Sequence, residues 1–177
     1  MNPPSEPVVF DPESHAVDAF RCGREGLDGR LRSYAGSGLS RDPARTFVTA
    51  SSDGTVLGYY TVVVSEIATA QAAAPITADA SQREPISVAM IARLAVDEGH
   101  QGGGVGRGLL LDALRRIVRA SEEVAVRAVI APAADRKAQG FYRHFGFEPS
   151  GLEPDLLMVP VRSVRRVVGG DASDLRE

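Results

Sequence analysis

A glycine-rich stretch, Gln101–Gly108 (QGGGVGRG), has residue types and spacing that suit the binding of phosphate. Glycine places no side chain between the backbone and a ligand and tolerates positive φ, so successive N–H groups can point toward one centre. The following run, from Val105 to about Ala120, has the apolar period of a helix, whose unpaired first-turn N–H groups would face the same ligand. We therefore predict an anion-binding loop; the alternative is a flexible connection between a strand and a helix.

Two familiar phosphate-binding patterns do not fit this stretch. The dinucleotide pattern G-x-G-x-x-G lacks its last glycine, because that place falls on Arg107 or Leu109. A P-loop needs Gly-Lys-Ser/Thr, whereas Gly106 is followed by Arg107-Gly108. The sequence does fit Gln-x-x-Gly-x-Gly, which resembles the acetyl-CoA pyrophosphate loop of the GNAT-superfamily N-acetyltransferases. This resemblance implies a cofactor-binding set comprising Gln101, Gly102, Gly103, Gly104, Val105, Gly106, Arg107 and Gly108.

Acetyl transfer also needs a polar group for the thioester carbonyl and a proton source for the leaving thiolate. The exposed backbone of Leu94, Ala95 and Val96, at the end of the strand before the loop, can reach the pantetheine arm and the carbonyl. Ala131-Pro132-Ala133, at the end of the next strand, offers no side chain for the polar pantetheine contact that is often found there.

A second motif contains a candidate proton donor, Tyr142. The pattern Asp135-x-x-Ala138-x-x-Phe141-Tyr142-x-x-x-Gly146-Phe147 is similar to the second GNAT signature, with Asp135 where Asn is more usual. The resemblance implies that Tyr142 lies by the sulfur of coenzyme A and acts as general acid. A phenol with a pKa of about 10 is protonated at pH 7 and can donate. Without that context, Tyr142 is an ordinary half-buried tyrosine.

Further stretches resemble a narrower group, the GNAT toxins of bacterial type II toxin–antitoxin pairs. They are Phe20–Gly23 with Leu27-Asp28, Arg45–Val48, Gly58–Thr61 and Ala92–Asp97. The resemblance implies acetylation of the α-amine of an aminoacyl-tRNA, which blocks translation, a ribbon-helix-helix antitoxin as partner, and a homodimer. Two alternatives stay open: a GNAT enzyme that acetylates a protein or small-molecule amine, and a non-catalytic acyl-CoA-binding regulator.

Several polar residues are weaker candidates. Arg93 lies in an apolar strand, so it must reach water, a partner or an anion; a structural ion pair and a contact with tRNA phosphate are both compatible with this position. No general base can be identified, because His144 and Glu148 are expected on the surface. The sequence also predicts no metal site, since His15 and His100 have no ligands at a useful spacing.

Length and composition predict one compact domain at residues 8–162, preceded by a disordered start at 1–7 and followed by a loosely held tail at 163–177. The 177 residues carry a formal charge of −3, so nothing in the overall balance attracts nucleic acid or an anionic membrane. A single cysteine, Cys22, excludes an internal disulfide and fits a reducing compartment. With no apolar run long enough to span a membrane, we expect a cytoplasmic protein without membrane contact.

The pattern of the chain predicts an α/β (α+β) fold, with a mixed sheet of about six or seven strands and about four helices. Expected strands are Pro7–Phe10, a hairpin of Arg45–Ala50 and Thr55–Ser65, then Ile86–Val96, Val124–Ala131 and Leu156–Val161. Expected helices begin at Asp11 and near Leu27, span Val105 to about Ala120, and follow Asp135. Ile67–Pro85 is expected to be a loop or one weak helix.

Overall fold

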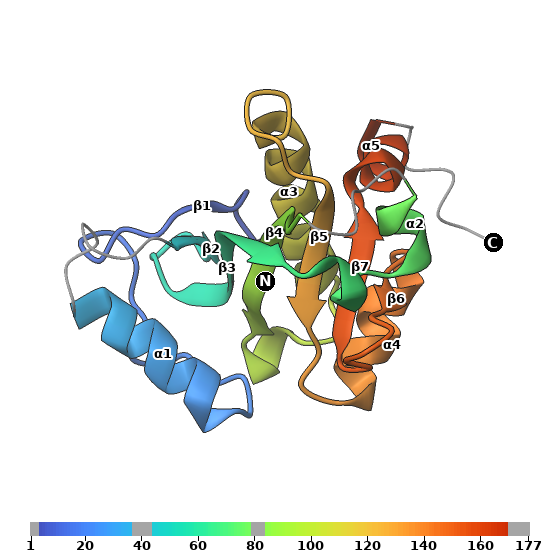
Figure 1. The fold of residues 1–177 in the computed structure, drawn as a ribbon. Helices are drawn as coiled ribbons and strands as arrows, with labels where there is room; N and C mark the ends of the chain where they lie inside the picture. The colour runs from blue at the N-terminus through green and yellow to red at the C-terminus, as the bar shows by residue number, and fades with distance from the viewer. Residues whose placement is uncertain (1–3, 37–43, 79–83, 170–177) are drawn as a thin grey trace. The chain divides into compact units, whose positions relative to one another are not determined.

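The computed structural model of the protein describes residues 4–36, 44–78 and 84–169. They contain strands β1 (Val8–Val9), β2 (Arg45–Ala50), β3 (Val56–Ile67), β4 (Ile86–Val96), β5 (Ala128–Pro132), β6 (Glu148–Pro149) and β7 (Leu156–Pro160). The helices are α1 (Glu25–Gly36), α2 (Ala74–Thr77), α3 (Val105–Ala120), α4 (Arg136–His144) and α5 (Val161–Gly169). Two short 3-10 turns lie at Thr69–Gln71 and Glu98–His100. The strands form one sheet in the order β1-β2-β3-β4-β5-β7-β6, which confirms the predicted mixed α/β fold (Figure 1).

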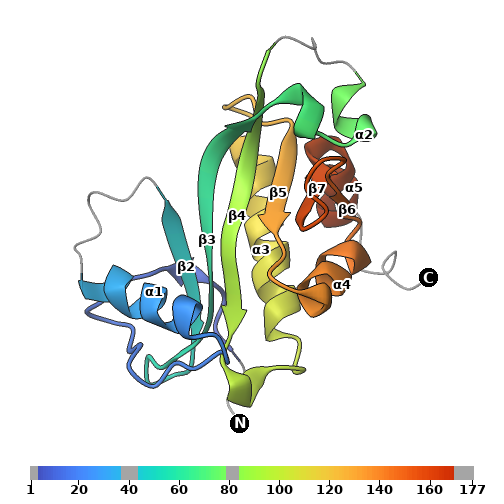
Figure 2. The ribbon, with the colours of Figure 1, turned by 60° about the horizontal axis from the view of Figure 1, so that its bottom comes forward.

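The chain groups into two compact units. The first comprises residues 1–62 and 93–112, and the second comprises residues 63–92 and 113–177. The two long strands, β3 and β4, each contribute to both units (Figure 2). The prediction of a single domain at residues 8–162 stays a prediction.

The first unit contains the predicted hairpin. β2 and β3 pair antiparallel from Arg45↔Val62 to Ala50↔Val56, and Gly54 takes φ 83° in the turn. Asp53 shapes this turn, since its Oδ1 accepts hydrogen bonds from the Ser51 hydroxyl and the Thr55 N–H. The bond from Ser51 is the main reason why the pKa of Asp53 falls to about 2. The hairpin prediction is therefore confirmed, with β3 starting one residue later.

Apolar side chains from the hairpin, from helix α1 and from the start of the chain form the core of the first unit. Its buried members are Phe10, Val17, Phe20, Leu31, Val48, Val56, Tyr59 and Ala95, and Cys22 packs against them. The hydroxyl of Tyr59 donates to the carbonyl oxygen of Leu27, which ties the hairpin to α1. Burial raises the pKa of Tyr59 far above its usual value, so this donor stays protonated.

The helix predicted at Asp11 is wrong, because this segment forms a turn. The two Asp11 carboxylate oxygens accept from the Glu13 N–H and the Ser14 hydroxyl. Ala16 then pairs with Thr55 beside the hairpin, which draws the chain away from a helical path. A side chain that satisfies nearby backbone donors competes with helix formation in this way. The second predicted helix is present as α1.

Gly58 in β3 is a close-packing position of the first unit, and its substitution should destabilise the fold. A Cβ there would lie 2.8 Å from Leu109 Cδ1 and 3.1 Å from the carbonyl oxygen of Ala95. We expect Gly58→Ala to lower the free energy of unfolding by about 1–3 kcal/mol, the usual cost of overpacking. Urea denaturation measures this change.

The matched control for Gly58 is Gly29 in helix α1, where an added Cβ meets no atom within 4 Å. Gly29→Ala should be neutral or stabilising by about 1 kcal/mol, because alanine favours a helix over glycine. Equal stability of Gly58→Ala and the wild type would contradict the close packing at this strand.

The second unit is built around β5, the strand at its centre. β5 pairs parallel with β4 from Val88↔Ala128 to Met90↔Ile130 and antiparallel with β7 from Ala128↔Pro160 to Pro132↔Leu156. A parallel pair needs a crossover connection, and the predicted helix α3 supplies it. The core on one face of these strands comprises Ile67, Ile76, Ile86, Val88, Ala128, Ile130 and Met158.

Three boundaries in the second unit differ from the prediction. The strand expected from Val124 begins only at Ala128, because the N–H of Val124 still bonds to Ala120 at the end of α3. The tail expected to be loose from residue 163 is helical up to Gly169, since Val161 and Val164 are buried on one side of α5. The remaining tail residues, from 170, lie outside the described chain. The segment Ile67–Pro85 contains Thr69–Gln71 and α2, and residues 79–83 lie outside the described chain.

Candidate functional site

The glycine-rich loop is fixed to the end of β4 by its first residue. The Gln101 amide nitrogen donates to the carbonyl oxygens of Val96, at 3.0 Å, and Cys22, at 3.2 Å. Asp97 adds two bonds, accepting from the N–H of Arg21 and of Gly99 at 3.0 Å each. Glu98 N–H also donates to the Arg21 carbonyl oxygen at 2.7 Å. The loop is therefore held to the segment before α1.

These bonds give Gln101 a positioning role in the protein, with its side chain turned toward the strand end and the Cys22 carbonyl. The prediction placed Gln101 among the ligand-binding residues without saying how. The sequence analysis names Asp97 only as the end of the stretch Ala92–Asp97, although its Asp-x-Gly spacing to Gly99 is typical of an aspartate that caps a turn.

The glycines after Gln101 leave open space beside the backbone. Gly102 and Gly104 adopt φ 77° and 85°, which glycine tolerates best. A Cβ added at Gly102, Gly104 or Gly108 would meet no protein atom within 4 Å. The backbone at these glycines is therefore accessible to a ligand that must approach it closely, such as a diphosphate.

Helix α3 begins at Val105, directly after these glycines. The first N–H groups of a helix have no partner within it, and the dipole makes this end partly positive. The first turn contains Val105, Gly106, Arg107 and Gly108, with Arg107 exposed. Open glycine backbone and a helix N-terminus thus meet in one loop, an arrangement that can bind an anion such as a diphosphate.

The strand end that precedes the loop lies in the same unit. Leu94, Ala95 and Val96 are the last three residues of β4, and Ala95 is buried while its neighbours are partly exposed. The Val96 carbonyl is already used by Gln101. The loop therefore lies between the end of a strand and the start of a helix, in the order that the sequence predicts.

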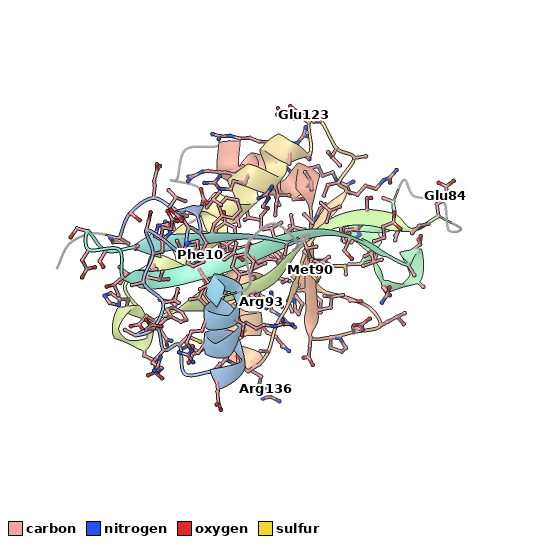
Figure 3. All side chains as sticks on the ribbon, turned by 90° about the vertical axis from the view of Figure 1, so that its left-hand side faces the viewer. Phe10, Glu84, Met90, Arg93, Glu123 and Arg136 are labelled. Carbon is pink, nitrogen blue, oxygen red and sulfur yellow. The ribbon has the colours of Figure 1, made fainter. Side chains whose placement is uncertain are left out.

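Arg93 lines a cavity of about 240 Å³ in the first unit, beside helix α1 (Figure 3). The other lining residues are Arg30, Leu31, Ser33, Tyr34, Thr46, Tyr59 and Thr61. Two guanidinium groups and several hydroxyls in one cavity make an environment suited to an anion. Arg30 was not predicted, because its place beside Arg93 depends on how α1 packs on the sheet.

Tyr142 lies in α4, in the second unit, and is 5% exposed. Its ring packs against Phe141 and Phe147, with centroids 5.3 Å apart in each case. Burial raises the pKa of Tyr142 far above its usual value, so the phenol stays protonated and able to donate.

From the sequence alone Tyr142 is expected to be half-buried, but the structure buries it, while Phe141 beside it is only partly buried. Gly146 takes φ 83° after the helix and turns the chain back, so that Phe147 packs on the Tyr142 ring. The predicted start of the helix is confirmed, since the Asp135 carboxylate accepts from the Ala138 N–H at 2.7 Å.

The remaining polar candidates behave as surface or structural groups. His144 and Glu148 are exposed, as expected. His100 Nδ1 lies 3.3 Å from Asp97 Oδ1, so His100 contacts one of the residues that hold the loop in place. Within residues 4–36, 44–78 and 84–169, no three His, Cys, Asp or Glu side chains lie close enough together to hold a metal ion. Among these described residues there is also no helix of the length and hydropathy that a membrane crossing requires.

Cys22, whose carbonyl holds the loop, should be a slow nucleophile. Burial, assisted by Asp28, raises the pKa of its thiol to about 11. Thiolate forms only as the pH approaches that value, so at pH 8 we expect alkylation by iodoacetamide to be about 10²-fold slower than for a free cysteine. Mass spectrometry against pH checks this, and a rate that levels off near pH 9 would contradict it.

A family comparison matches residues 43–149 to the acetyltransferase (GNAT) domain. The sequence is also 36% identical, over 153 residues, to a protein named tRNA-acetylating toxin from Mycobacterium tuberculosis, covering 86% of this chain and 90% of that relative.

Solved structures resemble the fold. AtaT complexed with acetyl-methionyl-tRNAfMet gives a TM-score of 0.82 at 24% identity, covering 91% of this chain and 97% of AtaT. A mutant AtaT toxin bound to acetyl-CoA and to the C-terminus of the antitoxin AtaR gives 0.73 at 23% identity, covering 93% and 98%.

Proposed function

Because this chain belongs to the GNAT acetyltransferase family, we propose that it is an acetyl-CoA-dependent N-acetyltransferase whose acceptor is the α-amine of an aminoacyl-tRNA. The observation that carries the donor half of this proposal is the loop Gln101–Gly108. It combines open glycine backbone, a helix N-terminus and firm anchoring at the end of β4.

In this proposal, the loop and the first turn of α3 bind the pyrophosphate through backbone N–H groups. The backbone of Leu94, Ala95 and Val96 binds the pantetheine arm and orients the thioester carbonyl. Arg107, exposed in the first turn, adds positive charge for the phosphates. Acetyl-CoA supplies the activated acetyl group.

The transfer proceeds by attack of the acceptor nitrogen on the carbonyl carbon, followed by cleavage of the carbon–sulfur bond. Tyr142 gives its phenolic proton to the departing thiolate. Burial raises the pKa of Tyr142, so the hydroxyl is protonated at neutral pH and available as a donor. The amine loses its proton to water in this scheme.

The acceptor is inferred from the relative named tRNA-acetylating toxin and from two arginines that line one cavity, Arg30 of α1 and Arg93 of β4. Arg93 and Arg30 would contact phosphate near the 3′ end of the tRNA. Removing either guanidinium should weaken tRNA binding and reduce its dependence on salt, since each phosphate contact releases counterions.

The same proposal extends to partners and location. An AtaT neighbour was solved with an antitoxin segment, so we propose a ribbon-helix-helix antitoxin that neutralises this enzyme. A homodimer and a cytoplasmic location complete the proposal, and light scattering of the purified protein tests the dimer.

The decisive experiment incubates the protein with labelled acetyl-CoA and a full set of aminoacyl-tRNAs. We expect label on at least one aminoacyl-tRNA and none on uncharged tRNA. If label appears only on proteins or on small amines, the tRNA acceptor is wrong but the protein is still an acetyltransferase. Binding of acetyl-CoA without any transfer would favour a regulatory protein.

A further inference from the structure

A buried tyrosine of β3, Tyr60, forms a hydrogen bond with the helix that follows the glycine-rich loop. Its hydroxyl donates to Oδ2 of Asp112 in α3 at 2.5 Å. Tyr60 is fully buried, and a hydroxyl that donates to a carboxylate at this distance makes a strong hydrogen bond. Both residues belong to the first unit. The pair therefore ties α3 to the hairpin of β2 and β3.

The ring of Tyr60 is held in place by the neighbouring strand. Phe47 of β2 pairs with Tyr60 across the hairpin. The two rings stack, with their centroids 5.0 Å apart and their planes 17° apart. The hairpin therefore fixes the ring that presents the hydroxyl to Asp112.

Gly58 brings the start of α3 against the same face of β3. Residues two apart in a strand point to the same side, so Gly58 and Tyr60 share a face. A Cβ on Gly58 would lie 2.8 Å from Leu109 Cδ1 and 3.3 Å from Val105 Cγ1. Val105, Leu109 and Asp112 have the i, i+4, i+7 spacing of one helical stripe. This stripe therefore contacts β3 from the first turn of α3 to Asp112.

The hydrogen bond is the directional contact in this stripe. The apolar contacts of Val105 and Leu109 tolerate a small rotation of the helix about its axis, because the hydrophobic effect is non-directional. A hydrogen bond weakens steeply when its geometry changes. A rotation of about 20° would move the Cα atoms, which lie about 2.3 Å from the axis, by about 0.8 Å. The length of an N–H···O bond varies over only about 0.5 Å, so such a rotation would misplace the first-turn N–H groups.

We propose that Tyr60 and Asp112 are positioning residues for the acetyl donor. Their hydrogen bond fixes the rotation of α3 and so aims the N–H groups of its first turn at the pyrophosphate. The inference rests on the proposed donor site at Gln101–Gly108 and deepens it. Asp112 lies seven residues after the start of α3, so the pair acts through the helix. Loss of the bond should weaken binding of the diphosphate and leave binding of the pantetheine arm unchanged.

The first test compares two ligands that differ in the pyrophosphate. Tyr60→Phe removes the hydroxyl and keeps the ring that stacks on Phe47. Calorimetric titration should show coenzyme A binding about 10-fold more weakly, the scale of one hydrogen bond to a charged ligand. NMR titration should show an unchanged affinity for pantetheine, which has no phosphate. Equal losses for the two ligands, or an unchanged affinity for coenzyme A, would overturn the proposal.

Tyr59→Phe is the matched control, because Tyr59 is the adjacent residue of β3 and is also buried. Its hydroxyl likewise donates one hydrogen bond, but to the carbonyl oxygen of Leu27 in α1. Urea denaturation should show a similar loss of unfolding free energy in both variants. Only Tyr60→Phe should lose affinity for coenzyme A. The same loss of affinity in Tyr59→Phe would assign the effect to general stability and contradict the positioning role.

Asp112 allows a rescue by a conservative variant. Asp112→Asn keeps a side-chain oxygen that can accept from Tyr60, whereas Asp112→Ala removes the acceptor. We expect coenzyme A to bind Asp112→Asn nearly as tightly as the wild type, and Asp112→Ala about 10-fold more weakly. Adding Tyr60→Phe to Asp112→Ala should cause no further loss, because the bond is already absent. Losses that multiply in the double variant would mean that the two residues act independently, against the proposal.

Steady-state kinetics separates this inference from the proposed function. With an aminoacyl-tRNA acceptor, Tyr60→Phe should raise the KM for acetyl-CoA by about 10-fold and leave kcat unchanged, because the pyrophosphate is held equally in the ground and transition states. If the wild type transfers acetyl groups and Tyr60→Phe has an unchanged KM, this inference fails and the proposed function stands. If the wild type neither binds coenzyme A nor transfers acetyl groups, the proposed function fails and the inference fails with it.

Discussion

Substituting Gly104 by valine is expected to abolish binding of coenzyme A. Gly104 takes φ 85° in the loop, and an added Cβ would enter space that no protein atom occupies within 4 Å. A branched side chain would occupy the space that a diphosphate needs next to the backbone, and it would also strain the positive φ. Calorimetric titration with coenzyme A should show at least a 10²-fold loss of affinity. Gly106→Val should have a similar effect.

Strain alone could weaken this protein, so the experiment needs a control with the same backbone conformation. Gly146 takes φ 83°, and an added Cβ there also meets no atom within 4 Å. It lies at the end of α4, outside the loop. Gly146→Val should therefore be destabilised like Gly104→Val but should still bind coenzyme A. Tight binding by Gly104→Val would refute the loop as the pyrophosphate site.

The loop and its neighbours could be predicted from the sequence because their signals are local. β4 and α3 have the predicted bounds, since an apolar strand ends at Asp97 and a periodic helix follows the glycines. The hairpin was equally clear from Asp53-Gly54 between two strands. In each case the residues that determine the structure are adjacent in the chain.

The sequence analysis did not predict the features that depend on contacts between segments far apart in the chain. The burial of Tyr142 depends on Phe147 folding back across it, and the pairing of Arg30 with Arg93 in one cavity depends on the packing of α1. Helix α5 follows β7 directly. Its burial of Val161 and Val164 depends on the core of the second unit, which the local sequence does not show. Asp11, by contrast, gave a misleading local signal, because the same carboxylate that can cap a helix closed a turn.

Tyr142→Phe is expected to reduce turnover by about 10²-fold or more while leaving the affinity for coenzyme A unchanged, which is the scale of a single general acid. The substitution keeps the ring that packs against Phe141 and Phe147 and removes only the hydroxyl. The unfolding free energy should therefore change little. Steady-state kinetics with labelled acetyl-CoA, together with calorimetric titration, separates the loss of turnover from any loss of binding.

The response of the rate to the acidity of the leaving thiol distinguishes a proton donor from a packing residue. Burial raises the pKa of Tyr142, so titration of its phenol should cause no fall in kcat up to about pH 10. If Tyr142 supplies the proton, thiolate departure in Tyr142→Phe must depend on water, and its residual rate should respond to the acidity of the leaving thiol more strongly than the wild-type rate does. Acetyl donors with thiols of different pKa test this. Unchanged turnover in Tyr142→Phe, or the same response to the leaving thiol in both proteins, would assign the proton to another group and leave Tyr142 as part of the core of α4.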